Sequence, residues 1–257
     1  SYIKYNRTLE LFIFGSKGDV IDHVNMADHV TYNGIRSCTV TDIGDDISYC
    51  YEVDGVRKSD PFRRNSTAIR RFADGKGAID LAKLYVDDFD WEGDRPLYIP
   101  FGDVIAYQLH VRGFTAHSSS KVKGRGKFSG IVEKIPHFTD LGINQIVLMP
   151  AYEFDEIARR NETVTMDSID YRTDPADDTV RVNYWGFTMG NYFMPKAAYS
   201  DGDPVNEFKA MVKALHKAGI EVVMRFYFPD CANKAFIPDI LKYWAREYHV
   251  DGFFLMG

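Results

Sequence analysis

The sequence predicts an N-terminal antiparallel β-sandwich followed by an α/β region, the first half of a (β/α)8 (TIM) barrel. In the first hundred residues, short β-branched and aromatic runs alternate with turn clusters, which is typical of antiparallel sheets. From Val104 onward, apolar runs of strand length alternate with segments whose apolar residues recur at helical spacing. We therefore assign residues 1–97 to the sandwich and residues 98–257 to the half-barrel.

Three segments of the first part have the composition of β-strands: Leu9–Phe14, Ser37–Val40 and Ser48–Val53. Ser16–Asp19 and Asp54–Gly55 contain residue types that turns favour, so each is predicted to reverse the chain. A sandwich of this kind is a binding or packing module, and the chemistry is expected in the second part.

Four segments of the second part have the apolar character of strands buried on both faces: residues 104–111, 144–149, 220–228 and 251–255. Four strands are half of the eight that close a (β/α)8 barrel. Because an open set of strands exposes its edges, we expect the remaining half from the same natural chain or from a partner.

Helices are predicted between these strands. The first has apolar positions Ile131, Ile135, Phe138 and Leu141, and Gly142 ends it. The second begins with Asp203 as N-cap and Pro204 in its first turn, and Gly219 ends it. Its apolar stripe comprises Phe208, Met211, Val212 and Leu215. The third begins near Pro238 and turns Leu241, Trp244 and Tyr248 inward.

Residues 153–182 differ from the segments around them. They contain nine acidic and four basic residues and little apolar periodicity. This composition indicates a long acidic loop insertion that is exposed to solvent.

Composition excludes several classes of function. A formal charge of −6 and a pI near 5.6 argue against nucleic acid as a partner. No apolar run is long enough for a membrane span, and the start of the chain lacks the pattern of a signal peptide. We expect a cytoplasmic protein; a secreted or cell-surface location, with a signal peptide removed, stays open. Cys38, Cys50 and Cys231 are an odd number at wide spacing, which favours free thiols. No metal site or cofactor is expected.

Several ordered blocks of the sequence resemble one known family. FDWEGDRPL at 89–97, YQLHVRGFT at 107–115 and the block from Lys134 to Glu156 are similar to the domain junction and first two barrel strands of pullulanases, isoamylases and bacterial glycogen debranching enzymes. These are debranching members of glycoside hydrolase family 13. NYWGFTMGNYFMPKAAYS at 183–200 resembles the segment before the third strand. YCYEVDG at 49–55, with the later DPF, resembles carbohydrate-binding module family 48.

The resemblance implies a substituted active site. The family's GFRxD motif, whose Asp is the nucleophile, aligns with residues 252–256, so that Phe254 replaces the Arg and Met256 replaces the Asp. The family's DVVYNH motif aligns with residues 225–230, so that Arg225 replaces the Asp and Asp230 replaces the His. A thioether cannot form the glycosyl ester of a retaining glycosidase. No catalytic residue is therefore assigned, and the family's acid/base Glu falls beyond Gly257.

Other residues of the matched motifs are candidates for binding sugar. Tyr184 and Trp185 lie where the family places aromatic residues near the cleft, and both glycan stacking and structural packing stay open for them. Asn183 and Tyr107 complete the candidate set. His110, within an apolar strand, is expected to be a core histidine. For Arg225, an ion pair with Asp230 and binding of an anionic ligand both stay open.

Three functional hypotheses follow. The first is an α-glucan protein that has lost catalysis and retains glucan binding or a regulatory role. The second is an active α-1,6-glucan hydrolase whose remaining catalytic residues lie beyond Gly257. The third is a structural or interaction domain that recognises no sugar.

Overall fold

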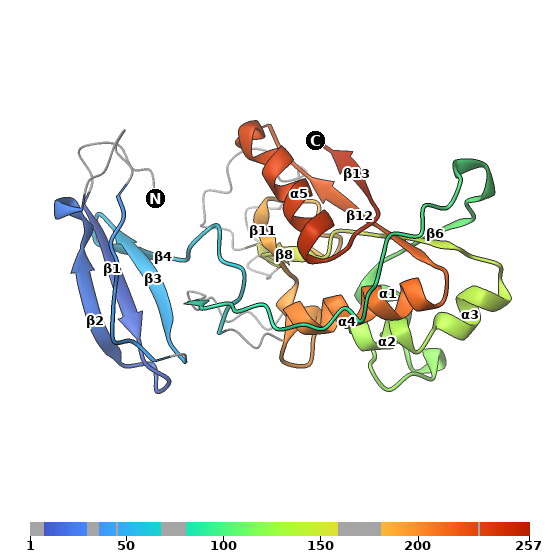
Figure 1. Cartoon of the computed structure of the whole chain (residues 1–257), viewed down its shortest axis with the longest axis horizontal. Coiled ribbons are helices and arrows are strands. Elements are labelled where there is room, and N and C mark those ends of the chain that lie inside the picture. Colours follow the sequence, from blue (N-terminus) through green and yellow to red (C-terminus); the bar gives the residue numbers. More distant parts are fainter. Residues whose placement is uncertain (1–7, 30–35, 45, 68–80, 159–180, 231) are drawn as a thin grey trace, which may run out of the picture. The chain divides into compact units, whose positions relative to one another are not determined.

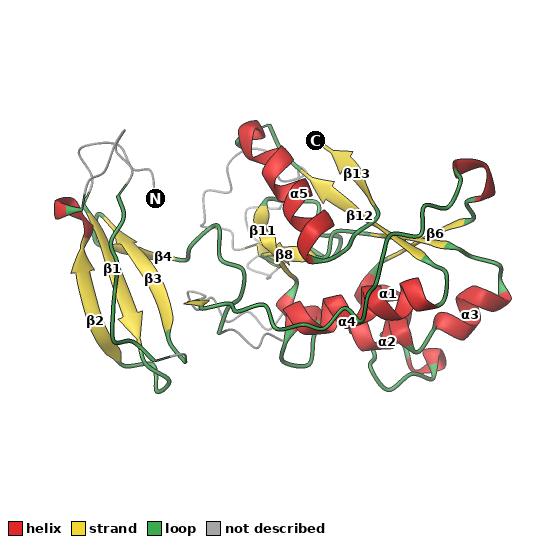
Figure 2. Ribbon diagram, in the orientation of Figure 1, coloured by secondary structure: helices red, strands yellow, loops and turns green. Residues whose placement is uncertain are grey.

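A computed structural model describes residues 8–29, 36–44, 46–67, 81–158, 181–230 and 232–257 of the chain (Figures 1 and 2). Its contacts divide the described residues into two compact units, one up to Asp87 and one from Asp88. Most of the predicted acidic insertion, and Cys231, lie outside the described residues. Cys38 and Cys50 are free thiols, and Cys50 is buried.

The first unit is built on an antiparallel sheet in the order β2-β1-β3-β4, with β5 also paired to β3. Its elements are β1 (Leu9–Phe14), β2 (Val20–Asn25), a 3-10 turn η1 (Met26–Asp28), β3 (Ser48–Val53), β4 (Val56–Lys58) and β5 (Ala82–Lys83). Asp54 and Gly55 both have positive φ, as the two-residue turn between β3 and β4 requires.

Two of the three strands predicted in this unit are confirmed with the expected bounds, as β1 and β3. The prediction of a strand at Ser37–Val40 is wrong, because those residues have no strand structure. Both long sides of β1 and of β3 are already paired with other strands, which leaves no place for it beside them. The second layer of a sandwich is not among the described strands, so the sandwich stays a prediction.

The second unit is built on a parallel sheet in the order β13-β12-β7-β6 (Figure 1). The strands are β6 (Ala106–Leu109), β7 (Gln145–Leu148), β12 (Glu221–Tyr227) and β13 (Gly252–Met256). All four predicted strands are present, and their chain order is also their order in the sheet. On β12, Val222, Met224 and Phe226 share one face and are fully buried, whereas the residues between them on the other face are partly buried. Burial on both faces, as predicted, is therefore not confirmed for this strand.

Helices and turns connect these strands. Before β7 the chain forms η3 (Phe101–Asp103), α1 (Val111–Thr115), η4 (Ser118–Ser120), α2 (Phe128–Val132) and α3 (Ile135–Asp140). The single helix predicted across residues 131–141 is thus two short helices. Pro136 explains the break, since it has no N–H for a continuous helix and is tolerated in the first turn of α3.

The two later helices lie where the sequence predicted them. In α4 (Pro204–Lys217) the Asp203 carboxylate accepts the Asn206 N–H at 3.0 Å, and the predicted apolar stripe is fully buried. The helix ends before Gly219, whose φ is +74°. After the turn η6 (Lys234–Phe236), α5 (Ile237–Glu247) buries Trp244 and is followed by the buried Tyr248, as predicted. The prediction for Leu241 is not confirmed, because Leu241 is only partly buried and Ile240 is the buried residue of that turn. No helix in the described ranges is long and apolar enough to cross a membrane.

The connection from β7 to α4 forms its own small sheets. β8 (Tyr152–Phe154) pairs with β11 (Gly190–Pro195), and β9 (Ile157–Ala158) pairs with β10 (Arg181–Val182). A turn η5 (Ala197–Tyr199) then leads to α4. Residues 183–189, between β10 and β11, carry the aromatic candidates, and we call them the aromatic loop.

Candidate functional site

All four strands of the parallel sheet finish at the same end, which we call the carboxyl end; the opposite end is the amino end. The register pairs Arg225 with Phe254 and Tyr227 with Met256. Leu109, Leu148 and Met224 are also in register, so His110, Met149, Arg225 and Phe254 follow as the next row across the sheet. Residues in register on parallel strands point to the same face. The row therefore places His110 on one surface with Arg225 and Phe254, two of the positions that the sequence aligned with the family's catalytic motifs.

The aromatic loop is held against this end by Tyr152 and by a glycine turn. The Tyr152 hydroxyl lies 2.7 Å from the Thr188 carbonyl and 3.1 Å from that of Gly186. Gly186 has φ +75°, and a Cβ there would lie 2.5 Å from the Phe154 ring. The Asn183 side chain accepts the Gly186 N–H at 3.2 Å. Only glycine fits this turn, so the loop has a defined conformation.

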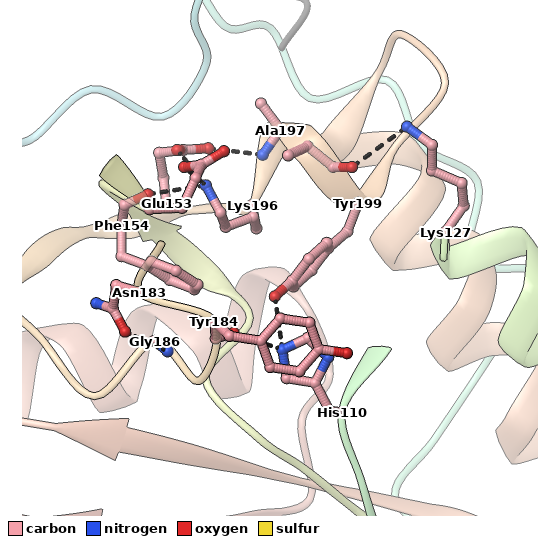
Figure 3. Close-up of polar contacts among 12 residues, drawn as sticks. His110, Lys127, Glu153, Phe154, Asn183, Tyr184, Gly186, Lys196, Ala197 and Tyr199 are labelled. Atoms are coloured by element: carbon pink, nitrogen blue, oxygen red, sulfur yellow. Dashed lines mark hydrogen bonds and ion pairs between the residues drawn. The ribbon is translucent and has the colours of Figure 1, made fainter. Parts of the chain in front are cut away.

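His110 supports the aromatic loop from below (Figure 3). Its Nδ1 accepts the Gly113 N–H at 2.9 Å, which leaves the proton of the neutral ring on Nε2. Nε2 lies 2.8 Å from the Tyr184 carbonyl and 3.1 Å from the Tyr199 hydroxyl. Burial lowers the pKa of His110, in agreement with a neutral ring. Both nitrogens are thus engaged, as expected for a core histidine.

The two aromatic candidates differ in what they contact. The Tyr184 ring stacks on His110 at 4.4 Å between centroids and 10° between planes. Trp185 stands edge-on to Tyr184 at 5.1 Å and is 49% exposed. Tyr184 therefore has a packing role, whereas Trp185 presents aromatic surface to solvent.

The structure brings Asn183, Tyr184 and Trp185 together but places Tyr107 elsewhere. Tyr107 lies on β6, and its ring contacts those of Phe114 and Phe138, on α1 and α3. Asn183 uses its side-chain oxygen within the turn, as described above. Among the four candidates, Trp185 is thus the one with a large exposed apolar surface.

On β12 and β13, the positions that the sequence aligned with the family's catalytic motifs, Arg225, Phe254 and Met256, carry no carboxylate. The guanidinium carbon of Arg225 lies 4.3 Å from the centre of the Phe254 ring, and the Arg225 Nε is buried without a hydrogen-bond partner. Asp230 is exposed and lies 3.5 Å from the Lys234 ammonium group. The ion pair between Arg225 and Asp230, one of the two possibilities raised by the sequence, is not formed.

A buried ionic cluster beside the aromatic loop, on the other side from His110, was not predicted from the sequence. The Lys196 ammonium donates to Glu153 at 2.9 Å, to Glu156 at 2.8 Å and to the Phe154 carbonyl at 2.8 Å (Figure 3). Burial lowers the pKa of Lys196, but the two carboxylates outweigh burial and raise it, so the amine stays charged. The prediction of a solvent-exposed stretch is wrong at Glu153 and Glu156, which are buried.

No charge pattern along the chain identifies this cluster, because Lys196 lies 43 and 40 residues from its carboxylate partners. Its role is to tie β8 to the end of β11, which fixes the base of the aromatic loop. Within the described ranges, no group of three or more His, Cys, Asp or Glu side chains is placed to hold a metal ion.

Comparison with known proteins finds relatives among isoamylases and GlgX proteins. The chain matches no protein-family profile. It is 35% identical to isoamylase 1, chloroplastic, of Arabidopsis thaliana, over 65% of this chain and 26% of the relative. It is 34% identical to isoamylase SU1 of Zea mays, over 67% of this chain and 26% of the relative. A glycogen operon protein GlgX homolog of Mycobacterium tuberculosis is 29% identical over 64% of this chain and 28% of the relative.

Solved structures agree in fold. Apo pullulanase from Paenibacillus barengoltzii superposes with a TM-score of 0.72 at 20% identity, over 96% of this chain and 44% of the pullulanase. The catalytic module of the pneumococcal glycogen-degrading protein SpuA superposes with a TM-score of 0.68 at 19% identity, over 96% of this chain and 43% of that module. The chain spans about a quarter of the length of the curated relatives named here.

Proposed function

We propose that this chain, which belongs to the debranching group of glycoside hydrolase family 13, is part of an α-glucan-binding protein that does not cleave glycosidic bonds. The sequential, parallel order β6-β7-β12-β13 supports the first half of a (β/α)8 barrel. We infer that the same natural chain or a partner supplies the other half.

The chemistry of the family explains why cleavage is not expected. A retaining glycosidase places one carboxylate to attack the anomeric carbon and a second carboxylic acid to protonate the leaving oxygen. At the position of the attacking carboxylate stands Met256, whose thioether has no acidic proton and leaves no stable ester with a sugar. The neighbouring Arg is also absent, since Phe254 occupies its place.

The single observation that carries the proposal is the pairing at the carboxyl end of the sheet. Arg225 lies beside Phe254, and Tyr227 lies beside Met256, in a continuous parallel register. The absence of a carboxylate at the aligned positions of both strands, Arg225 and Met256, supports loss of catalysis.

Retention of glucan binding is supported by the aromatic loop. The flat faces of aromatic rings pack well against the apolar faces of sugar rings. Trp185 presents such a surface, and the stacked pair of Tyr184 and His110 supports it from behind. We therefore expect the aromatic surface of Trp185 to bind glucan even though catalysis is lost.

The experiment is native affinity electrophoresis of the full-length protein in gels with and without glycogen, amylopectin or pullulan. We expect one or more polymers to retard the wild-type protein and Trp185→Ala to reduce the retardation. Phe101→Ala is the matched control, because Phe101 is 96% exposed and precedes β6 at the amino end.

Two outcomes would overturn the proposal. Release of reducing ends from pullulan or glycogen by the full-length protein would establish an active α-1,6-glucan hydrolase. Unchanged mobility in all three polymers would leave a structural or interaction domain as the better description.

A further inference from the structure

The strongest unexplained feature of the second unit is the positive charge at the carboxyl end of β12. Arg225 has no ion-pair partner among the described residues, and its buried Nε has no hydrogen-bond acceptor. The side chains beside it in the row, Met149 and Phe254, have no strong acceptor either. A buried N–H without an acceptor destabilises a fold and so opposes what the contact with Phe254 contributes.

Nearby acidic groups are engaged elsewhere. Glu153 and Glu156 bind Lys196, and Asp230 faces Lys234. The contrast with Lys196 is direct: that cation has two carboxylates and a carbonyl around it, whereas Arg225 rests on an aromatic ring. The carboxyl end of the sheet therefore carries an uncompensated cation beside the aromatic loop.

The geometry of Arg225 suits an oxyanion. A guanidinium group presents planar, paired N–H donors that match the oxygens of a phosphate or carboxylate. Its carbon lies 4.3 Å from the centre of the Phe254 ring, and this contact orients the group while leaving in-plane donors for a ligand. A phosphate ester offers three acceptor oxygens and nearly two negative charges, and is the better match to a lone cation.

The position of Arg225 relates it to the proposed sugar surface. His110, which supports the aromatic loop, lies two strands away in the same row. Neighbouring strands are about 4.8 Å apart, so the two backbones are separated by about 10 Å. A glucan that stacks on Trp185 is thus within a few sugar units of the guanidinium group.

We propose that Arg225 binds a phosphate group carried by the glucan, so that the protein prefers phosphorylated over neutral α-glucan. This inference rests on the proposed function, because it assigns the ligand class of the same site. The charge reversal from the family's Asp to Arg225 changes what the site accepts: a group that the relatives' carboxylate would repel becomes the preferred one.

The test compares one polymer in two states. Phosphorylated amylopectin and the same polymer after phosphatase treatment are each cast into native gels, and the full-length protein is run through both. We expect about tenfold tighter retention by the phosphorylated polymer, since hydrogen bonds to charged groups are the strong ones. Arg225→Gln should remove this preference and keep retention by the treated polymer. Arg246→Gln, at an exposed position of α5, is the matched control.

The outcomes separate the two proposals. Equal retention of wild-type protein by both polymers would overturn the phosphate inference and leave glucan binding intact. Retention by neither polymer would overturn the proposed function itself. The polymer comparison uses wild-type protein, so it remains decisive even if Arg225→Gln fails to fold.

A competition experiment distinguishes the source of the phosphate. Glucose 6-phosphate and inorganic phosphate are added separately to gels that contain the phosphorylated polymer. Weak competition by both agrees with a phosphate recognised together with its glucan chain. Complete release by inorganic phosphate at equal concentration would show a simple anion site and would contradict a phosphoglucan ligand.

Discussion

The two ends of the parallel sheet in the second unit differ in how their polar side chains are paired. At the amino end, buried carboxylates and a buried histidine contact partners from other elements. At the carboxyl end, the supporting residues are paired, but the buried Nε of Arg225 has no hydrogen-bond partner and Trp185 is 49% exposed. In parallel α/β folds the amino end serves stability and the carboxyl end carries the site. The comparison therefore indicates the carboxyl end as the place of the functional site.

The amino end is organised around a charged cluster. His216 lies between two carboxylates: its Nδ1 is 3.0 Å from Asp94, and its Nε2 is 2.8 Å from Asp251. His249 adds a second contact to Asp94 at 2.7 Å and stacks on Trp91. These contacts join residues 91–94 to α4 and to the start of β13.

A second set of contacts closes the same end. The Glu221 carboxylate accepts the Ile99 N–H and the Gln145 side-chain amide, each at 2.9 Å. The Asn144 side chain bonds both Ile105 and Asp103. The strands β7 and β12 are thus pinned to the segment that precedes β6, so loss of these pairs is expected to reduce stability.

The largest predicted effect is at Asp94. Asp94→Ala removes a buried carboxylate from two histidines and should lower the free energy of unfolding by about 3–5 kcal/mol, the usual cost of breaking a buried charged pair. Glu92→Ala is the control two residues away, because Glu92 makes its ion pairs with Lys213 and Lys217 in solvent. Urea unfolding of the full-length protein measures both. Equal effects of the two substitutions would contradict the conclusion that buried ion pairs stabilise this end of the sheet more than exposed ones do.

A change of pH is expected to have an intermediate effect on the free energy of unfolding, and the sign of this effect differs between the two ends of the parallel sheet. Burial opposes the charge on His216, but Asp251 and Asp94 outweigh burial and raise its pKa. Its contribution to stability is therefore complete below the ordinary histidine pKa of about 6.5 and is lost as pH rises through the raised value. Burial lowers the pKa of His110, so that contribution is lost as pH falls below about 6.5.

His216→Gln separates these two contributions. The variant should lose the decline in stability above about pH 6.5, because His216 no longer titrates, and keep the decline on the acid side, which comes from His110. Each pKa unit by which the fold raises the pKa of His216 corresponds to about 1.4 kcal/mol of stability. Unfolding midpoints of the full-length protein from about pH 5 to about pH 9 give the two slopes. An unchanged alkaline slope in the variant would mean that His216 is not the titrating group.

The sequence predicted those parts of the fold whose signals are local. The helix α4 follows from Asp203, its apolar stripe and Gly219, all within one continuous segment. The four parallel strands follow from apolar runs. The prediction of a strand at Ser37–Val40 was wrong because the composition suits a strand but no partner strand is available beside β1 or β3. Strand composition alone does not supply a partner.

The site was predicted less completely, because its contacts join distant residues. Alignment to the family identified Arg225, Phe254 and Met256, and the register then placed them together. The stack of Tyr184 on His110 joins residues 74 apart, and no pattern in either segment indicates it. The Lys196 cluster could not be predicted for the same reason. Its two glutamates lie in a segment whose composition predicted an exposed loop.

The smallest predicted effect on stability is at Arg225. Arg225→Met removes a contact with Phe254 worth about 0.5–1 kcal/mol and also removes a buried Nε that has no acceptor. Because these terms oppose each other, the free energy of unfolding should change by less than about 1 kcal/mol. Arg246→Met, on the exposed face of α5, gives the baseline for replacing an arginine. A loss as large as that expected for Asp94→Ala would show that Arg225 stabilises the fold. The carboxyl end would then resemble the amino end, and the cation would no longer mark a binding site.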